Sequence, residues 1–112
     1  MTVEDLSTAL NYECIQDQYE NADLKAGYTS DLLSDVMANA PEDSVLVTIQ
    51  AHKNTIAVAT LAGVRAIVVC NSRPIPEDMV ESARAEGVAI FRSEKNQFHV
   101  TTEIYEQLQE GG

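Results

Sequence analysis

Residues 45–70 read VLVTIQAHKNTIAVATLAGVRAIVVC, and this stretch decides the fold. It begins with a nearly continuous β-branched run, Val45 to Ile49, and ends with a second apolar run, Ala66 to Cys70. Between the two runs, Asn54 to Ala62 reads as a helix, and Gly63 is the residue type that commonly ends one. The pattern predicts a buried strand, a crossover helix and a second strand parallel to the first.

The same alternation continues toward the carboxyl end of the chain. Pro76 and the acids after it belong to the first turn of a helix that Gly87 closes, and residues 88–91 follow as a strand. A last helix is expected from about residue 96 to residue 109, with Gly111 and Gly112 as a frayed tail. We therefore predict an α/β fold of three layers, in which helices flank both faces of a mainly parallel sheet of about four or five strands.

The first forty residues are less regular. They predict a short helix at residues 2–9, a strand at 11–16, a polar loop at 17–23 and a short strand at 24–28. Ser30 and Asp31 then mark the start of a helix that stops before Pro41. No long linker interrupts the chain, so we expect one domain over residues 1–112 with its core at about residues 10–109.

The charge balance narrows the classes of partner. Seven Lys and Arg face eighteen Asp and Glu, which gives a formal net charge of −11. Such a chain repels phosphate backbones and anionic lipids, so we expect neither nucleic acid nor membrane as a partner. The absence of a signal sequence and of a long apolar run predicts a cytoplasmic protein. In that reducing compartment, Cys14 and Cys70 are expected to be buried thiols.

The motifs of common active sites are missing from the sequence. It contains no glycine-rich dinucleotide loop, no phosphate loop and no nucleophile elbow. His52 and His99 are the only imidazoles, and neither has the spacing of a zinc ligand. The scattered carboxylates are typical of a solvated surface. We predict that the chain is not an enzyme and that it uses no cofactor or metal.

One turn has the features of a ligand site. Gln50, His52, Lys53 and Asn54 lie between a predicted strand and a predicted helix. In open parallel sheets, ligands bind where strands end and helix N–H groups point outward. These four side chains could donate hydrogen bonds to an anion or a base, and Ser30 and Asp31 are the next candidates. The simpler interpretation is that Asn54 only caps its helix.

The helix that follows this turn contains no charge from Thr55 to Ala62. A helix that is apolar on every side must be covered on every side. Either the amino-terminal segment or a second copy of the chain could cover it, and its small residues would permit close approach. We expect a homodimer.

Three separated segments resemble the DRTGG domain family. They are GYTSDLLSDVM at residues 27–37, QAHKN at residues 50–54 and AVA at residues 57–59. The family's name motif falls on residues 23–27, where Asp23 and Gly27 match. The resemblance spans nearly the whole chain and implies a fold like the N-terminal domain of HPr kinase/phosphorylase.

Relatives of this family indicate an accessory role. Such domains occur in phosphotransacetylases and between the CBS domains of regulatory pyrophosphatases, where catalysis belongs to another domain. Stand-alone versions are similar to small proteins encoded with iron-only hydrogenase subunits. The resemblance therefore implies a homodimeric, hydrogenase-associated module without an activity of its own.

Together these observations predict a regulatory or assembly module. It would sense a small ligand, such as an adenine nucleotide or another anion, or dock on an enzyme complex such as a hydrogenase. One alternative is a purely structural dimerisation subunit, which would lack a pocket at the 50–55 turn. The other is an enzyme of the phosphotransfer class, which would need a general base paired with a nucleophile or metal.

Overall fold

The computed structural model describes residues 1–111, and in this range five strands form one sheet in the order β1-β5-β4-β3-β2. The strands are β1 (Glu13–Gln16), β2 (Ala26–Thr29), β3 (Ser44–Thr48), β4 (Ala66–Val69) and β5 (Ala89–Arg92). Strands β2 to β5 are parallel, whereas β1 pairs with β5 in the antiparallel direction. The predicted α/β class with a mainly parallel sheet is therefore confirmed.

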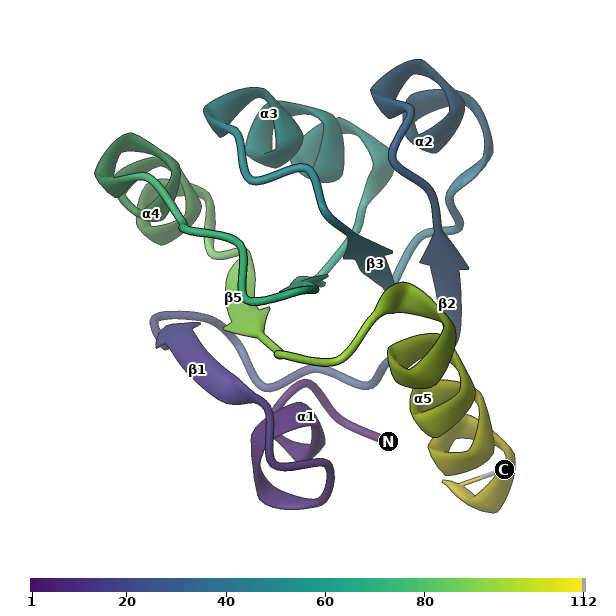
Figure 1. Ribbon diagram of the computed structural model, residues 1–112. Helices are drawn as coiled ribbons and strands as arrows, with labels where there is room; N and C mark the ends of the chain where they lie inside the picture. Colours follow the sequence, from purple (N-terminus) through teal and green to yellow (C-terminus); the bar gives the residue numbers. More distant parts are fainter. Residues whose placement is uncertain (112) are drawn as a thin grey trace.

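Helices cover both faces of this sheet, as Figure 1 shows. One face carries α2 (Leu33–Asn39), α3 (Lys53–Ala62) and α4 (Glu77–Glu86). The other carries α1 (Asp5–Thr8) and α5 (Gln97–Gly111). Every residue of β3 and β4 is buried, because these central strands have a helical layer on each side. Their continuous apolar runs, from which we predicted the fold, reflect this double burial.

The amino-terminal segment belongs to the core. Val3 and Leu6 are fully buried and pack in one cluster with Val68 and Phe91. This cluster lies on the α1–α5 face, whereas Ile56 of α3 belongs to the cluster on the opposite face. The amino-terminal segment therefore does not cover α3, and that sequence-based alternative is wrong.

Several element boundaries differ from the prediction. Helix α2 begins at Leu33 and not at Ser30 or Asp31, and α3 begins at Lys53, one residue early. Helix α5 continues through Gly111, and Gly112 lies outside the described residues. The two predicted glycine stops are confirmed: Gly63 and Gly87 end α3 and α4 at φ 78° and 71°, where side chains are disfavoured.

The two cysteines have different environments. Cys70 is fully buried beyond β4, and this burial raises the pKa of its thiol to about 11. Cys14 is exposed, so the prediction that both thiols are buried is wrong for this residue. The reason is that β1 is an edge strand and its first two residues face solvent.

Asp43 connects the segments that enter β2, β3 and β4. Its Oδ1 accepts a hydrogen bond from Arg65 Nε at 2.8 Å, and its Oδ2 lies 3.5 Å from Lys25 Nζ. These cations hold the pKa of the Asp43 carboxyl below its ordinary value. The ion pair therefore contributes stability above the unfolded-state pKa and loses that contribution as pH falls through the folded-state pKa.

The first prediction concerns this pH dependence. Asp43 has φ 58°, a conformation that asparagine tolerates, so Asp43→Asn removes the charge and keeps the backbone. The variant is expected to unfold at a lower urea concentration than the natural protein near pH 7, and this gap should close at an acidic pH below the folded-state pKa of Asp43. Urea midpoints at both pH values measure it. An equal gap at both values would contradict the assignment.

Candidate ligand site at the carboxyl edge of the sheet

The four parallel strands end at one edge of the sheet, here called the carboxyl edge. Four of the seven Lys and Arg residues lie at the last residue of one of these strands or in the segment that follows one. Lys53 follows β3, Arg73 follows β4, Arg92 ends β5 and Lys95 lies just beyond it. This edge is where ligands bind in open α/β sheets, and in an acidic chain its cations are the groups that can attract an anion.

Asp31 joins three elements at this edge. Its Oδ1 accepts hydrogen bonds from Thr48 Oγ1, the backbone N–H of Ile49 and Gln97 Nε2, each at 2.9 Å. Gln50 Nε2 donates to the Asp31 carbonyl oxygen at 2.9 Å. We call Asp31, Thr48, Gln50 and Gln97 the Asp31 cluster. It ties the end of β3 to the segment after β2 and to the start of α5.

The structure thus brings together two of the predicted site residues, Gln50 and Asp31. Their hydrogen-bonding groups are directed at the protein itself, so they hold the fold at the carboxyl edge. Ser30 has a local contact: its Oγ accepts a hydrogen bond from the backbone N–H of Leu32 at 3.2 Å. Thr48 and Gln97 were not among the residues predicted from the sequence, because their contacts with Asp31 cross from one element to another.

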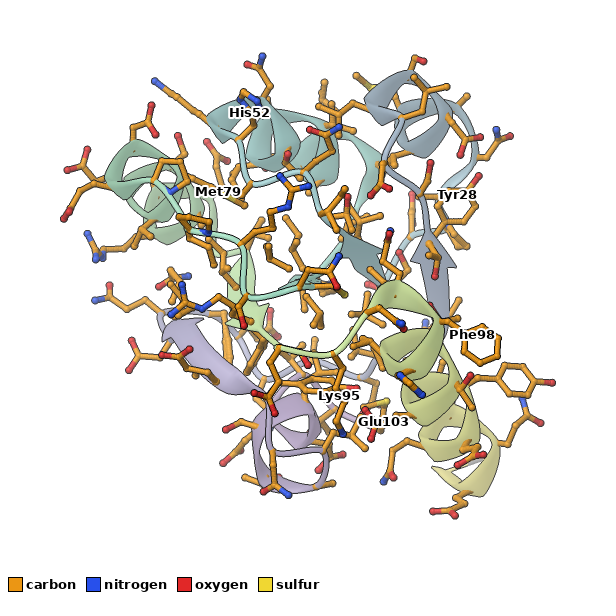
Figure 2. All side chains as sticks on the ribbon, viewed as in Figure 1. Tyr28, His52, Met79, Lys95, Phe98 and Glu103 are labelled. Atoms are coloured by element: carbon orange, nitrogen blue, oxygen red, sulfur yellow. The ribbon has the colours of Figure 1, made fainter. Side chains whose placement is uncertain are left out.

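The start of α3 is open to solvent. His52 occupies the N-cap position, and its side chain makes no capping hydrogen bond within residues 1–111. Asn54 is the second residue of the helix, so the interpretation of Asn54 as the helix cap is wrong. His52, Lys53 and Asn54 are all exposed. Figure 2 shows His52 at the outer end of α3.

Helix α3 differs from the other helices in the described range. It has neither a side-chain cap nor an acidic residue in its first turn. Each of the others has one of these features: Asp5 in α1, Asp35 in α2, Glu77 and Asp78 in α4, and for α5 Asn96, which accepts from the N–H of His99 at 3.0 Å. The partial positive charge at the start of α3 is therefore not offset from within the helix.

A cleft of about 270 Å³ begins at this end of α3 and runs along the groove between α3 and α4. Lys53 and Asn54 line the part of the cleft at the start of α3, and Ala57 and Leu61 line its apolar part. Ser82 and Glu86 of α4 supply polar groups on the opposite wall. No sequence motif connects them with Lys53, because the cleft exists only where two helices pack.

The geometry of this cleft suits a ligand with two chemical parts. Lys53 and the backbone N–H groups of the first turn can hold an anionic group, and within residues 1–111 no carboxylate lies within ion-pair distance of Lys53. The surface from Ala57 to Leu61 carries no charge and can contact a flat apolar body. A larger cavity lies further along the carboxyl edge, against β5.

Comparison with known proteins identifies a solved structure with a similar fold. The chain is similar to a crystal structure of the CBS and DRTGG domains of the regulatory region of Clostridium perfringens pyrophosphatase, complexed with the activator diadenosine tetraphosphate. The TM-score is 0.70 at 8% sequence identity, and the match covers 90% of this chain and 44% of that one. At this identity the likeness shows the fold alone. No family model matches the sequence, and no curated protein sequence matches it significantly.

No helix within residues 1–111 has the length and apolar character to cross a membrane. In the same range, no group of three or more His, Cys, Asp or Glu side chains is arranged to hold a metal ion. The groups present at the start of α3 are the Lys53 ammonium and backbone N–H donors, which lie beside an uncharged helix surface.

Proposed function

We propose that this chain is a non-catalytic regulatory or assembly module that binds an adenine nucleotide or another small anion in the α3–α4 cleft. The observation that carries the proposal is the open start of α3, where Lys53 stands at the mouth of the cleft. The fold likeness supports a regulatory role, because the similar structure is a regulatory region with an adenine nucleotide activator. Kinship with the DRTGG family is part of the same proposal.

Each part of a nucleotide has a matching part of the cleft. The phosphates would lie at the first turn of α3, where Lys53 and free N–H groups favour negative charge. The base would lie on the uncharged surface formed by Ala57 and Leu61. The Glu86 carboxylate on α4 supplies an acceptor for an exocyclic amino group such as that of adenine. His52 stands beside the phosphate position, and Asn54 lines the cleft itself.

The second prediction tests this site. In calorimetric titration, ATP is expected to bind the natural protein, and Lys53→Ala is expected to weaken binding about tenfold through loss of one charge-assisted contact. Asn54→Ala should weaken binding less and leave stability nearly unchanged, because Asn54 does not cap the helix. Lys25→Ala, a change of another exposed lysine before β2, is the matched control.

The titration has clear contrary outcomes. Absence of heat with ATP, ADP and AMP at millimolar concentration would remove the proposed nucleotide site. Equal affinity in the natural protein and in Lys53→Ala and Asn54→Ala would mean that any nucleotide binds elsewhere on the molecule.

A specific observation favours a second function, self-assembly. Leu61 is 73% exposed on the outer surface of α3, next to the exposed residues Ala57 and Thr60. An apolar side chain on an uncharged helix surface favours contact with another apolar surface. A second copy of the chain would supply one, which gives a homodimer with the outer surfaces of α3 in contact. Because Ala57 and Leu61 also form the surface proposed for the base, the second copy and the nucleotide base are alternative occupants of these two residues.

The third prediction concerns this dimer. Light scattering at micromolar concentration and moderate salt is expected to give the mass of a dimer, since salt screens the repulsion between two chains of net charge −11. Leu61→Asp is expected to halve that mass, because it places a charge in the contact. Leu32→Asp, at the N-cap residue of α2, which is 64% exposed, is the control and should remain dimeric. A monomer mass for the natural protein would contradict the proposal.

Docking on an enzyme complex, such as a hydrogenase, is the third part of the proposal and rests on the family resemblance. Its test is a pull-down from native lysate with the natural protein and with Leu61→Asp, followed by mass spectrometry. Recovery of subunits of one enzyme complex by the natural protein supports docking. Recovery of the chain alone would leave self-assembly and ligand binding as its functions.

A further inference from the structure

A cavity of about 530 Å³ lies at the carboxyl end of β5, separate from the α3–α4 cleft. Its walls come from the connection between α1 and β1, from Ser72 after β4, from the end of β5 and from α5. Figure 2 shows Lys95 and Glu103 together in the space between α1 and α5. Four segments that are distant in sequence therefore meet around one cavity.

Two ion pairs belong to the lining of this cavity. Arg92 Nε and Nη2 both donate to Glu13 Oε1, at 3.1 and 3.0 Å. Lys95 Nζ lies 2.7 Å from Glu103 Oε2, and the Tyr12 hydroxyl donates to Glu103 Oε1 at 2.9 Å. The positive and negative groups of the cavity are thus held in defined places before any ligand enters.

In these ion pairs, both the cations and a carboxylate keep hydrogen-bonding atoms that are not yet used. Within residues 1–111, Arg92 Nη1 and Glu13 Oε2 have no hydrogen-bond partner, and Lys95 Nζ uses only one of its three donors. The carboxylate of Glu94 and the hydroxyl of Ser72 also line the cavity. A ligand that needs a cationic and an anionic contact at once can find both without breaking either pair.

The backbone at the cavity is held in an unusual conformation. Two of the four non-glycine residues with positive φ within residues 1–111 line the cavity, Asn11 at 61° and Ser72 at 50°, and a third, Asn71 at 61°, directly precedes Ser72. The N–H groups of Asn71 and Ser72 donate to Lys95 and Ser93 carbonyl oxygens at 3.0 and 2.9 Å. Strained residues held by surrounding hydrogen bonds concentrate at binding sites, which agrees with the side-chain evidence.

We propose that this cavity binds a free α-amino acid as a zwitterion. The ligand carboxylate is held by Arg92 and Lys95, and its ammonium group is held by Glu13 and Glu94. A phosphate-bearing ligand fits less well, because three carboxylates and only two cations line the cavity. A wholly apolar ligand would remove water from these charged groups without offering them any polar contact in return.

The test uses the full chain labelled with ¹⁵N and each proteinogenic L-amino acid as a probe at about 10 mM. We expect at least one of them to cause saturable shifts of the Ser72, Ser93 and Lys95 amide resonances. Acetate and methylamine at the same concentration serve as half-ligands and should cause little change at these amides. No saturable shift with any amino acid overturns the proposal, and so does an equal response to acetate or methylamine alone.

Variants connect the response to the charges of the cavity. Arg92→Gln is expected to weaken binding about tenfold through loss of the carboxylate contact, and Glu13→Gln to weaken it through loss of the ammonium contact. Arg84→Gln, at an exposed arginine of α4, is the control and should bind as the natural protein does. If Arg92→Gln does not fold, Lys95→Gln replaces it. Unchanged affinity in a folded Arg92→Gln or Lys95→Gln variant would overturn the assignment.

Discussion

Replacing Asp31 with alanine is expected to lower the free energy of unfolding by about 2–4 kcal/mol. One oxygen of this carboxylate accepts from Thr48, Ile49 and Gln97, and the Thr48 side chain is fully buried. Alanine would leave these donors without their acceptor, and a buried donor without a partner is costly. Urea unfolding of the natural protein and the variant, followed by circular dichroism, measures the difference.

Asp31→Asn is the matched control for this experiment. It keeps a side-chain oxygen that can accept from the same donors and removes only the charge, so its loss should be about 1 kcal/mol. If both variants lose the same stability, the charge and not the shared acceptor is what matters. If neither loses stability, the Asp31 cluster does not hold the carboxyl edge together.

The central part of the fold could be predicted because its sequence signals are local. Val45 to Ile49 and Ala66 to Cys70 are apolar without interruption, since both faces of β3 and β4 are covered. The glycine at each helix end supplies a left-handed residue, so Gly63 and Gly87 were recognisable as stops. The environment of Cys14 was not predictable, because nothing in the sequence identifies β1 as an edge strand.

The candidate site was predictable only where it depends on a single turn. Lys53 and Asn54 follow β3 directly, and the rule for strand ends in open sheets indicated them. Gln50 was recognised as a polar residue after a strand and Asp31 as one at a helix start, but their mutual contact depends on β2 and β3 being neighbours. Ser82 and Glu86 could not be found, because their place in the cleft depends on how α4 packs against α3.

The amino-terminal segment shows most clearly how tertiary packing gives a role that local sequence does not reveal. The sequence predicts a short helix at residues 2–9, and in the structure only Asp5–Thr8 is helical. The segment is nevertheless fixed, because the N–H of Val3 donates to the Ala22 carbonyl oxygen at 3.0 Å and Leu6 is fully buried. It shares one face of the sheet with α5 and covers the part of that face that α5 leaves open (Figure 1).

Truncation of this buried leucine therefore has a large expected effect. Leu6→Ala should lower the free energy of unfolding by about 2–5 kcal/mol, because it removes buried methyl groups and leaves a cavity next to the sheet. Leu32→Ala makes the same chemical change at a side chain that is 64% exposed, and its effect should stay within about 0.5 kcal/mol. Urea unfolding curves of the three proteins, recorded at the same protein concentration, give the comparison. A small loss in Leu6→Ala, similar to that in Leu32→Ala, would mean that the amino-terminal segment is not part of the cooperative core and that α5 alone stabilises that face of the sheet.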